Sequence, residues 1–147
     1  MEKLCFFIGH RDAPDELMPA LCEAIEKHIL EYCVSEFIVG HYGQFDKLAA
    51  NAVIRAKEKY PEVKLTLLLP YHPAQRPIEI PKGFDGSFYP LETENTPLRY
   101  RIIKANQAMI RRAEYLITYV RHPASNAGNL AAYAAGRKSP AIHITKL

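Results

Sequence analysis

The chain has 147 residues, of which 48% are hydrophobic and 24% are charged, and its formal net charge is +3 at pH 7. This length and balance predict one globular domain, residues 1–147, and exclude a disordered chain. The mild positive charge is well below that of a dedicated nucleic-acid binder and suits an anionic small ligand equally well. No apolar run approaches the roughly 20 residues of a membrane span, so we expect no membrane partner.

The three cysteines, Cys5, Cys22 and Cys33, form no CxxC pair, and their odd number argues against a closed disulfide framework. Each lies in an apolar-periodic segment, so we expect buried, reduced thiols. The N-terminus lacks the basic and apolar regions of a secretory signal. Together these features predict a cytoplasmic protein.

The first half of the chain alternates continuous apolar runs with amphipathic stripes. A run closed by glycine, as at Gly9 and Gly40, is typical of a strand buried on both faces of a parallel sheet. Apolar residues recurring every three or four positions indicate helices, the first with Pro19 in its opening turn because a deeper proline would break it. The predicted elements here are strands at 4–8, 37–39 and 63–69, and two helices, one with an apolar stripe over 17–29 and one with a stripe over 48–56 that ends near Tyr60.

The segment from Tyr71 to Thr96 is rich in proline and glycine, which predicts a long loop with at most one short strand within 84–91. Thr96 and Pro97 are typical of a helix N-terminus, with the helix running to about residue 112. A strand at 115–120 follows. Ser125 or Asn126 could cap a further helix that ends at Gly136, before a last strand at 141–144.

This regular alternation of strands and helices predicts a parallel sheet with helices on both faces and right-handed crossovers. The expected fold class is α/β, a Rossmann-like three-layer sandwich with a mostly parallel central sheet. Ligands of such sheets bind outside the carboxyl ends of the strands. Three of these ends carry glycine and polar residues, at 9–11, 40–46 and 121–128.

The loop after the second strand is the most informative of the three. Gly40 and Gly43 bracket a tight turn that leads into a helix, whose free N–H groups suit an anion such as phosphate. Gly128 opens another helix in the same way, and the planar guanidinium of Arg11 could pair with a phosphate or a carboxylate. The alternative for each glycine is tight turning alone. Asp46 is either a ligand contact or a first-turn carboxylate that matches the helix dipole.

Asp46, His10 and His41 are the candidates for catalysis by a carboxylate or an acid–base group. His10, His41 and His122 each follow a strand, and any of them could equally be an ordinary hydrogen-bonded surface residue. Their spacing matches no metal-ligand motif, so neither a metal nor a cofactor is expected.

Gly40-x-x-Gly43-x-x-Asp46-x-x-Ala49 resembles the SLOG superfamily, which includes the DNA-processing protein DprA and the Lonely Guy enzymes. The likeness is closest to small stand-alone bacterial members of the YpsA type. Residues 9–11 match the first loop of that family, and 119–128 match its last loop. The resemblance covers essentially the whole chain in the right order.

The resemblance implies a Rossmann-like fold and a nucleotide or nucleotide-derived ligand. The contacts that it implies involve Gly9, His10, Arg11, Gly40, His41, Gly43, Gln44, Asp46, Arg101, His122, Asn126 and Gly128. The Pro-Gly-Gly-x-Gly-Thr-x-x-Glu motif of Lonely Guy enzymes is absent, and Asp46 is one methylene shorter than that motif's glutamate and lies in a different frame. This weakens the expectation of N-glycosidic cleavage.

Three functional hypotheses follow. The leading one is binding of a phosphate-bearing nucleotide derivative, as a sensor without assured catalysis. The second is a hydrolase acting on an N-glycosidic or phosphoester bond of a nucleotide. The third is a single-stranded nucleic-acid module of the DprA type, in which the basic stretch 99–112 around Tyr100 contacts a strand, although a solvated helix face is the commoner origin of such a stretch. A homo-oligomer is compatible with all three.

Overall fold

The computed structural model describes residues 2–147 and arranges six strands in one sheet of order β4-β3-β2-β1-β5-β6. The strands are β1 (Leu4–Gly9), β2 (Glu36–Val39), β3 (Lys64–Leu68), β4 (Gly86–Phe88), β5 (Tyr115–Tyr119) and β6 (His143–Lys146). The helices are α1 (Met18–Leu30), α2 (Gln44–Lys59), α3 (Arg101–Arg112) and α4 (Asn126–Ala135). Every neighbouring pair of strands is parallel, which is stricter than the mostly parallel sheet predicted.

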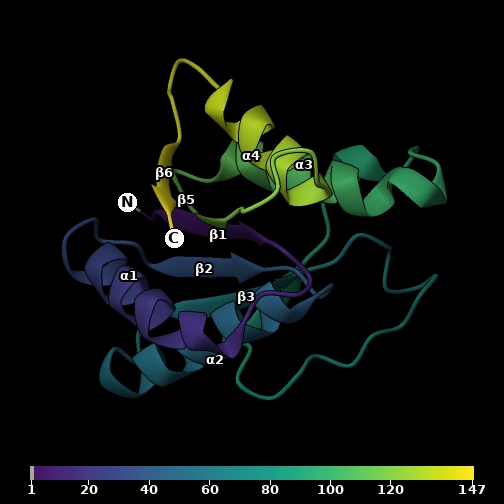
Figure 1. Cartoon of the computed structure of the whole chain (residues 1–147). Helices are drawn as coiled ribbons and strands as arrows, with labels where there is room; N and C mark the ends of the chain where they lie inside the picture. Colours follow the sequence, from purple (N-terminus) through teal and green to yellow (C-terminus); the bar gives the residue numbers. More distant parts are fainter. Residues whose placement is uncertain (1) are drawn as a thin grey trace.

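The helices form a layer on each face of the sheet, with α1 and α2 on one side and α3 and α4 on the other (Figure 1). The period-two alternation of each strand divides the apolar side chains between these layers. Phe7 and Phe37 face α1 and α2, whereas Phe6 and Ile38 belong to the cluster under α3 and α4. The predicted three-layer Rossmann-like α/β fold is therefore confirmed.

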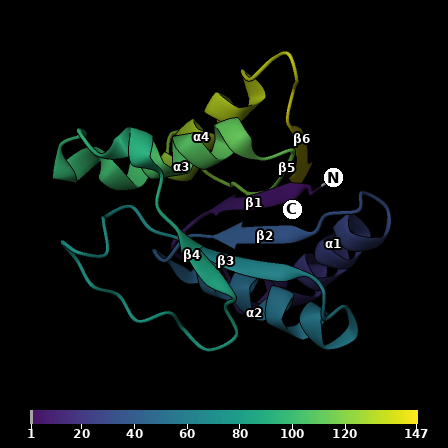
Figure 2. The same cartoon turned by 180° about the vertical axis from the view of Figure 1, so that it is seen from behind.

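The long loop between β3 and β4 runs along the side of the molecule where the carboxyl ends of these strands lie (Figure 2). The segment 71–96, predicted as a loop with at most one short strand, contains β4 within the predicted range 84–91. Lys57 of α2 anchors its return by donating a hydrogen bond to the Gly83 carbonyl and pairing with the Asp85 carboxylate. The Asp85 carboxylate also accepts from the Leu65 N–H at 2.8 Å, which ties the loop to β3.

Two predicted elements differ from the structure by more than one residue at an end. Pro97 has ψ of 143°, so it is extended, and a 3₁₀ turn at Leu98–Tyr100 precedes α3, which begins at Arg101. The buried Arg101 side chain donates to the carbonyls of Glu94 and Thr96 and so fixes the chain just before this turn. The last strand begins at His143, where pairing with Tyr115 of β5 starts, and not at residue 141.

Other local predictions hold. Pro19 lies in the first turn of α1, Ser125 caps α4 by accepting from the Gly128 N–H at 3.0 Å, and Gly136 is the C-cap of the same helix. The cysteines are free, but the expectation that all three are buried is wrong, because Cys5 alone is buried and Cys22 is half-buried. Cys33 is exposed, because it lies in the turn after α1 with a positive φ of 58°. No helix among residues 2–147 is long and apolar enough to cross a membrane.

Candidate functional site

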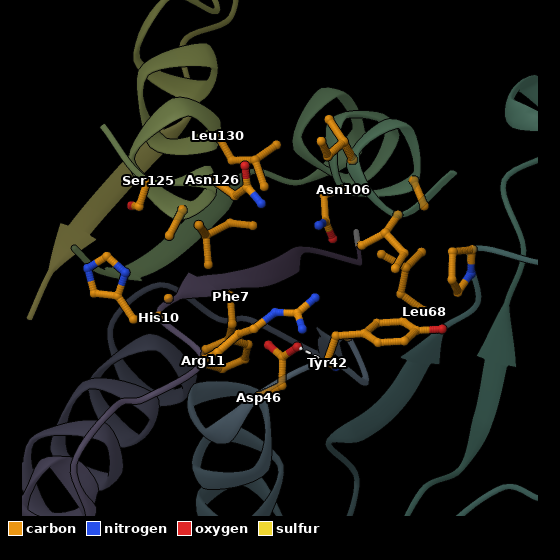
Figure 3. Close-up of a pocket in the computed structure, with 18 residues that line it drawn as sticks. Phe7, His10, Arg11, Tyr42, Asp46, Leu68, Asn106, Ser125, Asn126 and Leu130 are labelled. Atoms are coloured by element: carbon orange, nitrogen blue, oxygen red, sulfur yellow. Dashed lines mark hydrogen bonds between the residues drawn. The ribbon is translucent and has the colours of Figure 1, made fainter. Parts of the chain in front are cut away.

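A cavity of about 230 Å³ lies at the carboxyl ends of the central strands (Figure 3). The first turn of α2 borders it on one side, and α3 and the N-terminus of α4 border it on the other. Successive crossovers run from β1 to β4 in one direction and then jump to β5 on the other side of β1, so the cavity lies at the topological switch point. Its lining residues are Phe7, Ile8, Gly9, His10, Arg11, Gly40, Tyr42, Asp46, Leu68, Pro70, Ile102, Ile103, Ala105, Asn106, Ser125, Asn126, Ala127 and Leu130. Six of the twelve residues predicted for ligand contact therefore line one cavity.

Arg11 follows β1, and its guanidinium extends into the cavity (Figure 3). Its backbone is fixed because the Arg11 carbonyl accepts from the Gln44 N–H at 2.9 Å. The guanidinium forms no ion pair with any carboxylate of residues 2–147. A planar fork of free donors at a cavity is suited to a phosphate or carboxylate of a ligand.

Asp46 lies in the first turn of α2 and points into the same cavity. One carboxylate oxygen, Oδ2, accepts from the Tyr42 N–H at 3.1 Å. A side chain at Gly40 would place its Cβ 2.9 Å from this oxygen, which is a packing reason for glycine there. Burial raises the pKa of Asp46 from 3.8 to about 6, although the Tyr42 N–H and the positive charge of Arg11 act in the opposite direction.

His10 lies at the end of the cavity away from Tyr42 (Figure 3) and is 7% exposed. Its Nε2 accepts two backbone N–H groups, from Arg121 at 2.7 Å and from His122 at 3.3 Å. An acceptor nitrogen carries no proton, so the ring proton resides on Nδ1. His10 can therefore offer a ligand one hydrogen-bond donor, and Nε2 is not free to act as a base.

The N-terminus of α4 forms the wall next to His10. Ser125, Asn126 and Ala127 all line the cavity. The Gly128 N–H is used by the Ser125 cap, whereas the N–H groups of Asn126 and Ala127 have no acceptor within the described part of the chain. Free N–H groups at the positive end of a helix dipole are typical of anion sites.

Sequence reasoning missed the wall formed by α3 and the end of β3. Ile102, Ile103 and Asn106 of α3 line the cavity, as do Leu68 and Pro70. Asn106 lies across from Asp46, and Leu68 lies beside the Tyr42 ring (Figure 3). Asn106 follows Ile102 by one helical turn, so a polar side chain within the apolar stripe was the available signal.

Gly43 and Gln44, predicted as contacts, lie outside the cavity lining. Gly43 has φ of 130°, and its Cβ would approach the Arg11 backbone, so glycine is required for the turn. The N–H groups of Gln44 and Phe45 donate to the Arg11 and His10 carbonyls, so the N-terminus of α2 does not present them to a ligand. His41 is exposed and does not line the cavity.

Arg101 is 6% exposed and points away from the cavity lining into the segment before α3. It donates to the Thr96 carbonyl at 2.6 Å, to the Glu94 carbonyl at 2.5 Å and to the Tyr89 hydroxyl at 3.2 Å. These contacts tie the start of α3 to the end of the loop that precedes it. The structure thus gives this side chain an intramolecular role.

His122 and Gly128 also lie outside the lining. The His122 ring packs against His10 with centroids 5.2 Å apart. A Cβ on Gly128 would overlap the Pro123 carbonyl, so this glycine allows the loop after β5 to pack on α4. Both residues pack against groups next to the cavity and do not line it.

The basic stretch of α3 is largely paired within the protein. Arg112 donates to both carboxylate oxygens of Glu92 at 2.7 Å, and Arg111 contacts Glu92 and the Tyr133 hydroxyl. These interactions hold the pKa of Glu92 at about 2, well below its ordinary value. Lys104 remains exposed on the same helix.

Fold and cavity together define a Rossmann-like α/β protein with six parallel strands and a polar cavity at its switch point. No protein-family model matches the chain, and no curated protein matches it significantly in sequence. The class is therefore defined by the sheet and the cavity.

Proposed function

We propose that the cavity binds a nucleotide or a phosphate-bearing nucleotide derivative. The observation that carries this proposal is the set of donors without protein partners that line the cavity, most of them at the end next to α4. The Nδ1 of His10 and the N–H groups of Asn126 and Ala127 lie at this end, and the Arg11 guanidinium reaches into the cavity beside Asp46 (Figure 3). A phosphate, with several strong acceptor oxygens, would satisfy such a set.

The other end of the cavity suits a base. The Tyr42 ring, Leu68, Pro70 and Ile102 present apolar surface there. A volume of about 230 Å³ is just below the range of about 300 Å³ and above that is typical of small-molecule pockets. A mononucleotide-sized ligand matches this scale better than a polymer does.

Membership of the SLOG superfamily is part of the proposal, and it rests on the sequence resemblance and on the Rossmann-like fold. In this interpretation the protein is a cytoplasmic ligand sensor, alone or as a homo-oligomer. The nucleic-acid alternative has less support, because Arg111 and Arg112 are engaged by Glu92.

A hydrolase is the second candidate, and Asp46 is the observation that favours it. A carboxyl group with a pKa of about 6, next to an arginine in a cavity, has the properties of a general acid or base near neutral pH. Release of base or phosphate from nucleoside monophosphates, compared between the native protein and Asp46→Asn, tests this candidate. Equal release by both proteins, or none above a protein-free control, would reject it.

A thermal-shift panel with AMP, ADP, ADP-ribose, NAD, cyclic dinucleotides and a short single-stranded oligonucleotide, at two salt concentrations, tests binding. A ligand at about 100 times its Kd adds roughly 2.7 kcal/mol, which raises Tm by roughly 2–8 °C. Arg11→Gln should reduce affinity by roughly tenfold or more, because it removes a charged donor. Arg55→Gln, an exposed arginine of α2 outside the cavity, is the control.

A shift with one nucleotide class that Arg11→Gln abolishes and Arg55→Gln preserves would support the proposal. No shift with any nucleotide, or equal shifts in both variants, would contradict it. A shift with the oligonucleotide alone that weakens with salt would favour the nucleic-acid alternative instead.

A further inference from the structure

We propose that Asn106 and Asp46, on opposite walls of the cavity, bind the sugar hydroxyls of the ligand and so select ribonucleotides over 2′-deoxyribonucleotides. This inference rests on the proposed function and adds a specificity for the sugar. Asn106 belongs to α3 and Asp46 to α2, so the two walls come from opposite layers of the fold.

Asn106 has no structural role that explains it. It lies in the middle of α3, where asparagine is a poorer helix former than alanine or leucine. Its neighbours one turn earlier, Ile102 and Ile103, are apolar cavity residues, so an apolar side chain would continue their surface. The amide makes no hydrogen bond with any of residues 2–147, and its tip points into the cavity (Figure 3). A ligand is the partner that this amide lacks.

Asp46 has one unused oxygen. Its Oδ2 accepts the Tyr42 N–H, whereas Oδ1 receives no hydrogen bond from the described residues. The carboxyl group points from the floor of the cavity toward the side on which Asn106 lies (Figure 3). An ionised carboxylate can only accept, and an amide can both donate and accept.

The order of groups along the cavity places a sugar between these two residues. His10 and Asn126 lie toward one end, and Leu68 and the Tyr42 ring lie at the other (Figure 3). A nucleotide has its sugar between phosphate and base, so the sugar would lie in the polar middle. A hydroxyl both donates and accepts, which makes it complementary to a carboxylate facing an amide. A 2′-deoxy sugar would leave one of them unpaired, and sites of this kind discriminate strongly against the analogue that lacks the hydroxyl.

Isothermal titration calorimetry of the full chain with the four ribonucleoside 5′-monophosphates and their 2′-deoxy counterparts tests this inference. Asn106→Ala removes the amide at a position where alanine favours the helix. Gln107→Ala is the matched control, because it removes an amide from the next position of α3, which does not line the cavity.

The native protein should bind the ribonucleotide roughly tenfold to a hundredfold more tightly than its 2′-deoxy form. Asn106→Ala should bring this ratio below about threefold by weakening the ribonucleotide alone, and Gln107→Ala should keep it. Equal affinity of the native protein for both sugars would overturn the inference and leave the proposed function standing. A changed preference among bases in Asn106→Ala with an unchanged sugar ratio would also overturn it, since Asn106 would then contact the base. Failure of all eight nucleotides to bind would overturn the inference for mononucleotides, and the thermal-shift panel with the larger derivatives would decide the proposed function separately.

Discussion

The N-termini of α2 and α4 follow similar kinds of loop but differ in whether their first N–H groups are free. Both helices follow a strand and a loop with glycine and polar residues, and both suit an anion by that criterion. At α2 the Gln44 N–H donates to the Arg11 carbonyl at 2.9 Å and the Phe45 N–H to the His10 carbonyl at 3.3 Å. At α4 the first N–H groups remain open to the cavity.

The difference comes from what each helix meets in the sheet. Strand β1 lies next to β2, so the loop after β1 passes over the N-terminus of α2 and supplies carbonyl oxygens. This arrangement uses up the N–H groups that could bind an anion at α2, and it fixes the backbone of Arg11, whose side chain reaches into the cavity. The N-terminus of a helix is therefore a ligand site only where no segment of the chain has already satisfied it.

Gly128→Ala should have the largest effect, because it disturbs the packing at the N-terminus of α4. A Cβ at this position would overlap the Pro123 carbonyl, and a backbone group cannot move aside as a flexible side chain can. We expect a loss of roughly 2–3 kcal/mol in the free energy of unfolding by urea denaturation. Gly136→Ala at the other end of α4 meets its nearest atoms at 3.6 Å and is the control, with an expected change within about 0.5 kcal/mol. Similar losses in both variants would show that the packing of Gly128 is not special.

Asp46→Asn should have the next largest effect on the free energy of unfolding, and it should stabilise the protein. Burial raises the pKa of Asp46 from 3.8 to about 6, so the folded protein binds a proton more tightly than the unfolded chain does. Stability therefore falls as the pH rises from about 4 to 6, and the full cost is present above pH 6. The variant keeps an acceptor for the Tyr42 N–H and should gain roughly 1–2 kcal/mol at pH 7.5 and much less at pH 4. A gain that does not depend on pH would contradict this explanation.

Ser125→Ala should remove the side-chain cap of α4, whose Oγ accepts from the Gly128 N–H. The expected cost is about 1 kcal/mol in thermal or urea unfolding. Ser125→Asp, which keeps an acceptor at the cap, should restore most of that stability. If the alanine and aspartate variants were equally unstable, capping would not be the cause.

Gln44→Ala should have the smallest effect. The Gln44 side chain donates to the Asp15 carboxylate at 2.9 Å on the exposed surface, whereas the start of α2 is held by backbone hydrogen bonds. We expect a change within about 0.5 kcal/mol in the free energy of unfolding. A loss as large as that of Ser125→Ala would mean that side chains hold both helix ends alike.

Much of the fold followed from local patterns. The apolar runs around Phe6, Ile38 and Leu116 predicted strands because residues buried on both faces need no alternation. The glycine at position 9 and the cap at Ser125 located strand and helix ends. The beginning of α3 was misplaced, because Arg101 fixes the preceding segment through contacts that no local pattern reveals.

The cavity was predicted only in part. Residues that follow strands, such as Arg11 and Asn126, were placed at the carboxyl edge by the rule for parallel sheets. Asn106 and Leu68 could not be assigned, because their contribution depends on how α3 crosses the sheet. The closure of the α2 N-terminus likewise depends on a neighbouring loop that is distant in sequence.

The position of β1 at the centre of an all-parallel sheet also bears on how the chain folds. One edge of β1 pairs with β2, and the other edge pairs with β5. The second pairing, in which Cys5 lies opposite Tyr115, can form only after β5 has been synthesised. During synthesis, β1 to β3 can assemble with α1 and α2 while Phe6, Ile8 and Ile38 still lack the cover of α3 and α4. Long-range parallel pairing closes slowly, and an uncovered strand edge beside apolar side chains promotes aggregation. The partly made protein should therefore be a better chaperone client than the finished one.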